Sequence, residues 1–114
     1  MKNTVTLINN IPTLKVHEPS ELSSFELIDV RRADEFNGEL GHIEGAKLVT
    51  LGDDLQHFLA SEDKTKKILF ICRSGMRSAS ATELALSQGF TEVFNMDGGM
   101  IDWNEKEYPI TRDA

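Results

Sequence analysis

Short apolar runs alternate with helical patterns along this chain. Four stretches have the length and composition of buried strands, namely Leu27–Val30, Ala46–Leu51, Ile68–Ile71 and Val93–Met96. Between the second and third of these stretches, apolar residues at positions 51, 55, 58 and 59 recur at the spacing of one helix face. The alternation predicts an α/β fold in which helices cover both faces of a parallel sheet.

Start and stop signals predict the remaining elements. We expect a helix from Glu18 with Pro19 at its first position, one helical turn over Asp34–Phe36, a helix after Ser78 that ends near Gln88, and a last helix over Met100–Lys106. Gly89 suits the left-handed cap of the third of these helices. The residues before Glu18 are assigned no strand.

Size and composition indicate one globular domain. The chain has 114 residues, of which 39% are hydrophobic and 27% charged, values that are ordinary for a water-soluble domain with its own core. We expect a single domain over residues 1–114, with its informative motifs between about residues 14 and 110.

The charge balance narrows the classes of partner. A net charge of −7 argues against a nucleic-acid-binding surface and against binding to anionic membranes. No apolar run approaches membrane-spanning length, and the first thirteen residues lack the continuous apolar core of a signal peptide. With one cysteine no intrachain disulfide forms, so we expect a cytoplasmic enzyme or carrier that needs no cofactor.

That single cysteine, Cys72, holds the candidate chemistry. It ends the apolar run at Ile71, Gly75 permits a tight loop, and the residues after Ser78 are good helix formers. A loop that leads into a helix directs backbone N–H groups and the positive end of the helix dipole toward one point. A thiolate fits there, although a lone cysteine after a strand also suits a small buried hydrophobe.

Four motifs in the same order resemble the single-domain rhodanese family, the thiosulfate sulfurtransferase-like proteins. They spread from Asp29 to Trp103: Asp29-Val30-Arg31 with Glu35-Phe36, Gly41-His42-Ile43-Glu44-Gly45-Ala46, Cys72-Arg73-Ser74-Gly75-Met76-Arg77-Ser78, and Gly98-Gly99 with Trp103. Ala33 and Glu44 depart from the family pattern, since many members carry proline at both positions. The resemblance implies a rhodanese-like fold with a five-stranded parallel sheet between two helical layers.

The resemblance also implies a role for each residue of the cysteine loop. Cys72 is then the nucleophile that becomes a persulfide, and the loop from Arg73 through Ser74, Gly75, Met76 and Arg77 to Ser78 binds the substrate. The two arginines suit an anionic sulfur donor such as thiosulfate, and Met76, the variable residue of the loop, is expected at the substrate mouth.

Residues outside the loop are expected to support it. Asp29 and Arg31 form an acid and base at a strand end, His42 is expected to anchor a loop, and Gly98-Gly99 to shape a tight one. The three histidines have no metal-ligand spacing with one another or with Cys72, so no metal is expected.

Loop length separates this chemistry from phosphate chemistry. Four residues lie between Cys72 and Arg77, whereas phosphatases of the same fold and protein tyrosine phosphatases have five. A phosphatase also needs an acid for the leaving group, and the sequence places neither Asp97 nor Asp102 there. The first hypothesis is therefore an enzyme that passes sulfur from thiosulfate or a persulfide to cyanide or a thiol.

Two alternatives stay open. One is a persulfide carrier or sulfur-sensing module that delivers sulfur to an accepting protein and turns over thiosulfate poorly. The other is a phosphatase or arsenate reductase on the same scaffold.

Overall fold

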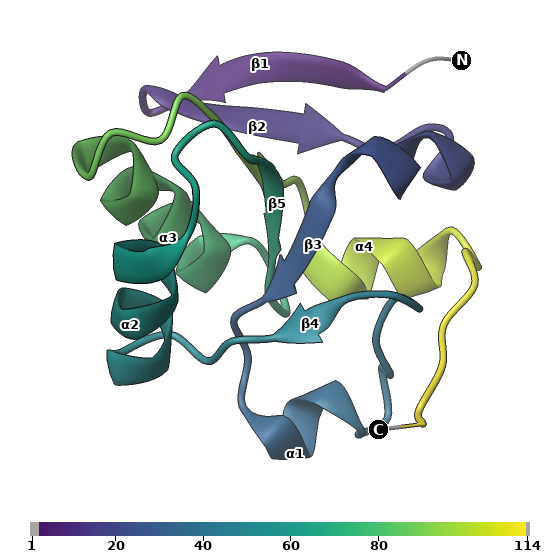
Figure 1. Cartoon of the computed structure of the whole chain (residues 1–114). Helices are drawn as coiled ribbons and strands as arrows, with labels where there is room; N and C mark the ends of the chain where they lie inside the picture. Colours follow the sequence, from purple (N-terminus) through teal and green to yellow (C-terminus); the bar gives the residue numbers. More distant parts are fainter. Residues whose placement is uncertain (1–2, 114) are drawn as a thin grey trace.

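The computed structural model describes residues 3–113, which form a mixed sheet of six strands with helices on both faces (Figure 1). The strand order across the sheet is β1-β2-β6-β5-β3-β4. The strands are β1 (Thr4–Ile8), β2 (Ile11–Lys15), β3 (Glu26–Asp29), β4 (Lys47–Leu48), β5 (Lys67–Ile71) and β6 (Glu92–Met96). The helices are the 3-10 helix η1 (Pro19–Ser24), α1 (Ala33–Phe36), α2 (Asp53–Ser61), α3 (Met76–Ser87) and α4 (Gly99–Glu105).

Five of the six strands run parallel, which confirms the predicted parallel sheet. The sixth strand is a difference from the prediction, because β1 pairs antiparallel with β2 in an N-terminal hairpin. Asn9 and Asn10 form the hairpin turn with φ angles of 52° and 66°, which asparagine tolerates better than most residues. Every residue of β1 is exposed, so the strand has no buried face that the hydrophobic pattern could reveal.

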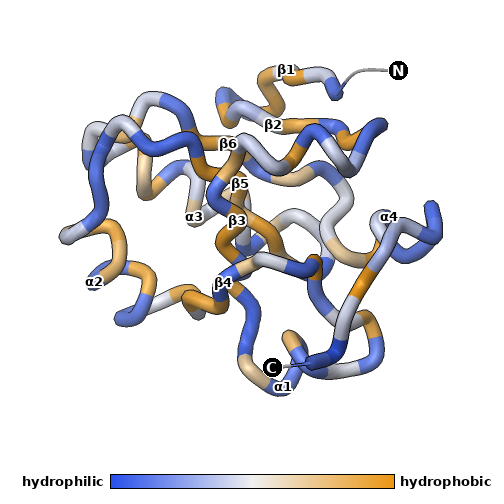
Figure 2. Tube along the Cα trace, turned by 45° about the vertical axis from the view of Figure 1, so that its right-hand side comes forward, coloured by the Kyte–Doolittle hydropathy of each residue, from blue (hydrophilic) through white to orange (hydrophobic). Residues whose placement is uncertain are grey.

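Helices cover both faces of the sheet, as predicted. On one face, α2 and α3 pack against the sheet through Leu55, Leu59, Ala81 and Ala85. On the other face, α4 packs through Met100 and Trp103, and η1 through Leu22. Apolar segments accordingly gather at β3, β5 and β6 in the centre of the sheet (Figure 2).

The predicted elements are present with shifted bounds. The expected helix from Glu18 is a 3-10 helix, and the expected strand Ala46–Leu51 pairs only over Lys47–Leu48. The helix after Cys72 ends at Ser87, and Gly89 has the predicted positive φ, 99°. Among residues 3–113, no helix is long and apolar enough to cross a membrane.

The parallel arrangement decides where functional residues meet. The strands β3, β5 and β6 all end at one edge of the sheet, because neighbouring parallel strands point the same way. Arg31 follows β3, Cys72 follows β5 and Asp97 follows β6. This edge is where ligands bind in open α/β sheets.

Candidate active site

The cysteine loop connects β5 to α3 at this edge. Cys72 is 1% exposed, and its Sγ accepts a hydrogen bond from the Gly75 backbone N–H at 3.1 Å. Gly75 has a φ of 104° and is the N-cap of α3, so the thiol lies beside the positive end of a twelve-residue helix. A backbone N–H group and the start of a helix therefore meet at the sulfur, which is the arrangement that the sequence predicted for this loop.

The first turn of α4 holds the other side of the loop. Met100 N–H donates to the Cys72 carbonyl at 2.9 Å, and Ile101 N–H donates to the Arg73 carbonyl at 3.0 Å. This approach requires a glycine at position 99, because a Cβ there would lie 2.5 Å from the Arg73 carbonyl oxygen. The prediction that Gly98-Gly99 shapes a tight loop is confirmed.

A second polar contact to the sulfur comes from α3. The Ser78 Oγ lies 3.2 Å from Cys72 Sγ and 2.5 Å from the Asn95 Oδ1. Asn95 in turn donates from its Nδ2 to the Gly75 carbonyl at 3.1 Å, so this β6 residue contacts two residues of the loop. Sequence reasoning missed Asn95, although a buried amide within the apolar run Val93–Met96 was a visible signal.

Arg77 forms a bidentate ion pair with Glu35 of α1. The two Nη–Oε distances are 2.7 and 2.8 Å, and the side chains are 33% and 16% exposed. The hydrogen bond from Arg77 holds the pKa of Glu35 at about 2, well below its usual 4.5. The pair ties the start of α3 to α1 and engages both terminal nitrogens of Arg77, so this arginine braces the loop.

Asp29 and Arg31, the predicted supporting pair, contact α1 through the Arg31 guanidinium. Arg31 and Asp29 are both buried, and the Arg31 Nη2 is 2.8 Å from the Asp29 Oδ2. Arg31 also donates to the carbonyls of Gly41, at 2.7 Å, and Glu35, at 3.3 Å. The guanidinium therefore fixes the loops that follow β3, as expected for a structural role at a strand end.

His42 anchors the same region, as predicted. Its Nδ1 lies 2.7 Å from the Phe36 carbonyl oxygen, and its ring stacks on the Phe36 ring with the centroids 3.6 Å apart. The side chain is buried, and both of these contacts are to Phe36, so it stabilises the geometry of the 36–46 segment.

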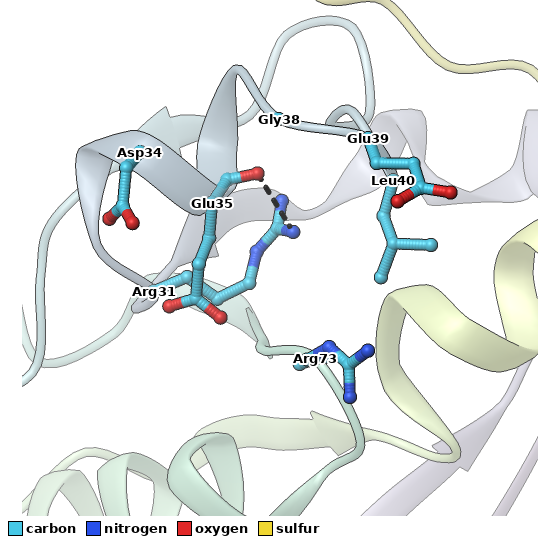
Figure 3. Close-up of a pocket in the computed structure, with 7 residues that line it drawn as sticks. All are labelled: Arg31, Asp34, Glu35, Gly38, Glu39, Leu40 and Arg73. Atoms are coloured by element: carbon cyan, nitrogen blue, oxygen red, sulfur yellow. Dashed lines mark hydrogen bonds between the residues drawn. The ribbon is translucent and has the colours of Figure 1, made fainter.

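Arg73 extends from the loop into a hollow of about 260 Å³. Figure 3 shows this hollow, which Arg31, Asp34, Glu35, Gly38, Glu39 and Leu40 line together with Arg73. Within residues 3–113, Arg73 forms no ion pair, whereas Arg31 and Arg77 do. In the described part of the chain, Arg73 is therefore the arginine of the cysteine loop that has no carboxylate partner.

A second hollow, of about 360 Å³, lies on the other side of the loop. Ser74, Gly75 and Met76 line it from the loop, and Ile8 and Asn9 line it from the hairpin. Met76 is 79% exposed and lines this hollow, and its place at the substrate mouth stays a prediction.

Comparison with known proteins agrees with the fold and the motifs. The rhodanese-like domain model matches residues 13–106. The chain is 33% identical to thiosulfate sulfurtransferase GlpE of Shewanella oneidensis, over 75% of this chain and 82% of that protein. It is 37% identical to putative sulfurtransferase YtwF of Bacillus subtilis, over 90% of this chain and 96% of that protein. The human single-domain sulfurtransferase TSTD1 superposes with a TM-score of 0.73 at 28% identity, over 82% of this chain and 96% of that one. The chain belongs to the rhodanese-like domain family.

Proposed function

We propose that this protein is a sulfurtransferase that works through a persulfide on Cys72. The Cys72 thiolate attacks the outer sulfur of thiosulfate, the S–S bond of the donor breaks, and sulfite leaves with the bonding electron pair. The persulfide then gives its terminal sulfur to cyanide or to a thiolate, and the Cys72 thiolate is regenerated. Relatives named as sulfurtransferases support the activity.

The observation that carries this proposal is the set of donors around the only thiol of the chain. The Gly75 N–H donates to Sγ, and the start of α3 lies behind it. The Ser78 hydroxyl is 3.2 Å from Sγ and can turn to donate once the sulfur is charged. Preorganised donors of this kind stabilise charge on the thiolate before attack and on the persulfide after it. The proposal needs no histidine base, because a backbone N–H and a helix start can hold the charge of the sulfur.

The charges around the loop support an anionic donor that binds at Arg73. Asp29 compensates Arg31, and Glu35 compensates Arg77, so among residues 3–113 Arg73 supplies the uncompensated positive charge of the loop. A thiosulfate whose outer sulfur points at Cys72 directs its sulfonate toward this guanidinium. We therefore assign donor binding chiefly to Arg73 and loop bracing to Arg77.

The phosphatase alternative is less well supported. The four-residue spacing between Cys72 and Arg77 is shorter than that of phosphatases, and Arg77 already holds a carboxylate. Of the two candidate acids, Asp102 is 3.0 Å from Lys106 and pairs with it. We therefore expect that this protein does not hydrolyse an aryl phosphate.

Intact-protein mass spectrometry tests the proposal directly. After incubation with thiosulfate, the wild type should gain the mass of one sulfur atom, and cyanide should remove that mass and yield thiocyanate. Cys72→Ser should fold, gain no sulfur and form no thiocyanate above background, because a serine hydroxyl is not ionised near neutral pH. Sulfur uptake with slow thiocyanate release would favour the carrier alternative, and turnover by the serine variant would refute the covalent mechanism.

A further inference from the structure

The Ser78 hydroxyl lies between two groups that compete for its single proton. Its oxygen is 2.5 Å from the Asn95 Oδ1 and 3.2 Å from Cys72 Sγ. A serine hydroxyl has one hydrogen to donate, so it cannot serve both acceptors at once. The acceptor toward which the O–H points receives a hydrogen bond, and the other acceptor faces a lone pair of the Ser78 oxygen.

The orientation of the Asn95 amide determines which acceptor receives the Ser78 hydrogen bond while Cys72 is a neutral thiol. The group opposite its other end is the Gly75 carbonyl, at 3.1 Å, and a carbonyl only accepts hydrogen bonds. The Nδ2 must therefore point at Gly75, which leaves Oδ1 toward Ser78. With the amide held in this way, the hydroxyl donates to Asn95 along the shorter contact, and its lone pair faces the sulfur.

This arrangement suits a neutral thiol, whose S–H can donate to the Ser78 oxygen, but not a thiolate. Once the thiol proton has left for solvent, the hydroxyl must turn toward Sγ to stabilise the charge, and the Asn95 oxygen then loses its donor. The same turn serves the terminal sulfur of a persulfide. Asn95 thus opposes ionisation through the contact between its Oδ1 and the Ser78 hydroxyl.

We propose that Asn95 is a positioning residue that controls the ionisation of Cys72 through the Ser78 hydroxyl. In the thiol state the hydroxyl donates its hydrogen bond to Asn95, and in the charged states it turns and donates to the sulfur. This inference rests on Cys72 being the nucleophile of the proposed function. It assigns to β6 a part in the sulfur site that none of the four motifs contains.

The charged groups around the sulfur come from several elements and stay the same in the variants below. Arg77 is close enough to Cys72 and to Asp29 for its charge to interact with both side chains. The loop adds Arg73, and Asp97 lines the hollow that Gly75 and Asn95 share. Two further charges belong to ion-pair partners, namely Arg31, which pairs with Asp29, and Glu35, which pairs with Arg77. A change at Asn95 to an apolar residue alters none of these charges.

The test is the pH dependence of Cys72 alkylation by iodoacetamide, with Cys72→Ser as the blank. Since the chain has one cysteine, the rate reports this thiolate alone. Asn95→Leu has nearly the shape of asparagine but no acceptor, and should lower the midpoint of the profile by about one pH unit, a roughly tenfold gain in thiolate at low pH. Asn95→Ala should shift it in the same direction and keeps the test available if the leucine variant folds poorly.

Two further variants separate this role from a general loss of structure. Ser78→Ala should raise the midpoint, and Asn95→Leu added to it should cause no further shift, because the route through the hydroxyl is gone. Thr82→Val removes a buried hydroxyl that donates to the Ser78 carbonyl at 2.7 Å, and should cost stability without moving the midpoint. A midpoint that Asn95→Leu leaves unchanged or raises, or a shift that persists without the Ser78 hydroxyl, would overturn the proposal.

The outcome is independent of sulfur transfer, because alkylation needs no sulfur donor. Mass spectrometry of the same samples after thiosulfate reports the proposed function separately. If the wild type takes up no sulfur but the alkylation midpoints shift as expected, the proposed function fails and the role of Asn95 stands.

Discussion

The ion pair between Glu35 and Arg77 offers a quantitative test of how the cysteine loop is held. Glu35→Gln removes the negative charge and keeps the shape of the side chain. The variant also keeps an oxygen that can accept the Arg32 backbone N–H, which is 3.1 Å from Oε1 in the wild type. The substitution therefore isolates the charge of the pair from the capping contact on α1.

The size of the effect follows from the pKa of the carboxyl group. A fall from 4.5 to about 2 on folding corresponds to about 3 kcal/mol of stability, as an upper limit. One-third of the Arg77 side chain is exposed, and solvent screening weakens such a pair. We expect Glu35→Gln to lower the free energy of unfolding by about 1–3 kcal/mol at neutral pH.

The pH dependence has a definite sign. Because the folded protein lowers the pKa of Glu35, the stabilisation is complete above about pH 4.5 and is lost as the pH falls toward about 2. Urea unfolding followed by the fluorescence of the buried Trp103 should show a gap between wild type and variant that is constant above pH 5 and narrows below pH 4.

Asp34→Asn is the matched control on the same helix. Asp34 pairs with Arg32, but the two side chains are 73% and 66% exposed, so the variant should unfold at nearly the same urea concentration as the wild type. The reasoning is wrong if Glu35→Gln is as stable as this control at neutral pH. It is also wrong if the gap between wild type and Glu35→Gln stays the same down to pH 3.

Three further predictions concern the loop itself. Arg73→Ala should lower kcat/KM about 10- to 150-fold for thiosulfate and much less for an uncharged sulfur donor, and equal losses for both donors would contradict donor binding. One glycine inserted after Gly75 should abolish most sulfur transfer in the thiocyanate assay, because the loop donors then lie too far from a single sulfur atom; a variant that retains full activity would refute the loop-size argument. Gly99→Ala should lower the free energy of unfolding by about 2–4 kcal/mol, since its Cβ meets the Cys72 and Arg73 carbonyls. Gly45→Ala, where φ is also positive but the space is open, should cost only about 1 kcal/mol in the same urea titration.

Local patterns in the sequence determined the central part of this protein. The run Ile68–Ile71 is buried because it lies between helices on both faces, and such a strand is continuously apolar whatever its neighbours are. The loop from Cys72 to Ser78 was likewise readable, because a strand end, a glycine and a helix start are all contiguous. These features depend on residues close together in the chain, so sequence alone was sufficient for them.

Only the tertiary structure decided which distant groups meet at the loop. Glu35 is 42 positions from Arg77 and Asn95 is 17 from Ser78, and neither separation leaves a periodic signal. The two arginines of the loop looked alike in sequence, yet Arg77 is neutralised by a carboxylate and Arg73 is free of one within residues 3–113. The hairpin strand β1 was hidden for a related reason: it has no buried face, and its pairing with β2 is what makes it a strand. The position of the proposed nucleophile was local information, whereas strand order and helix packing set the charged groups and hydrogen-bond partners that surround it.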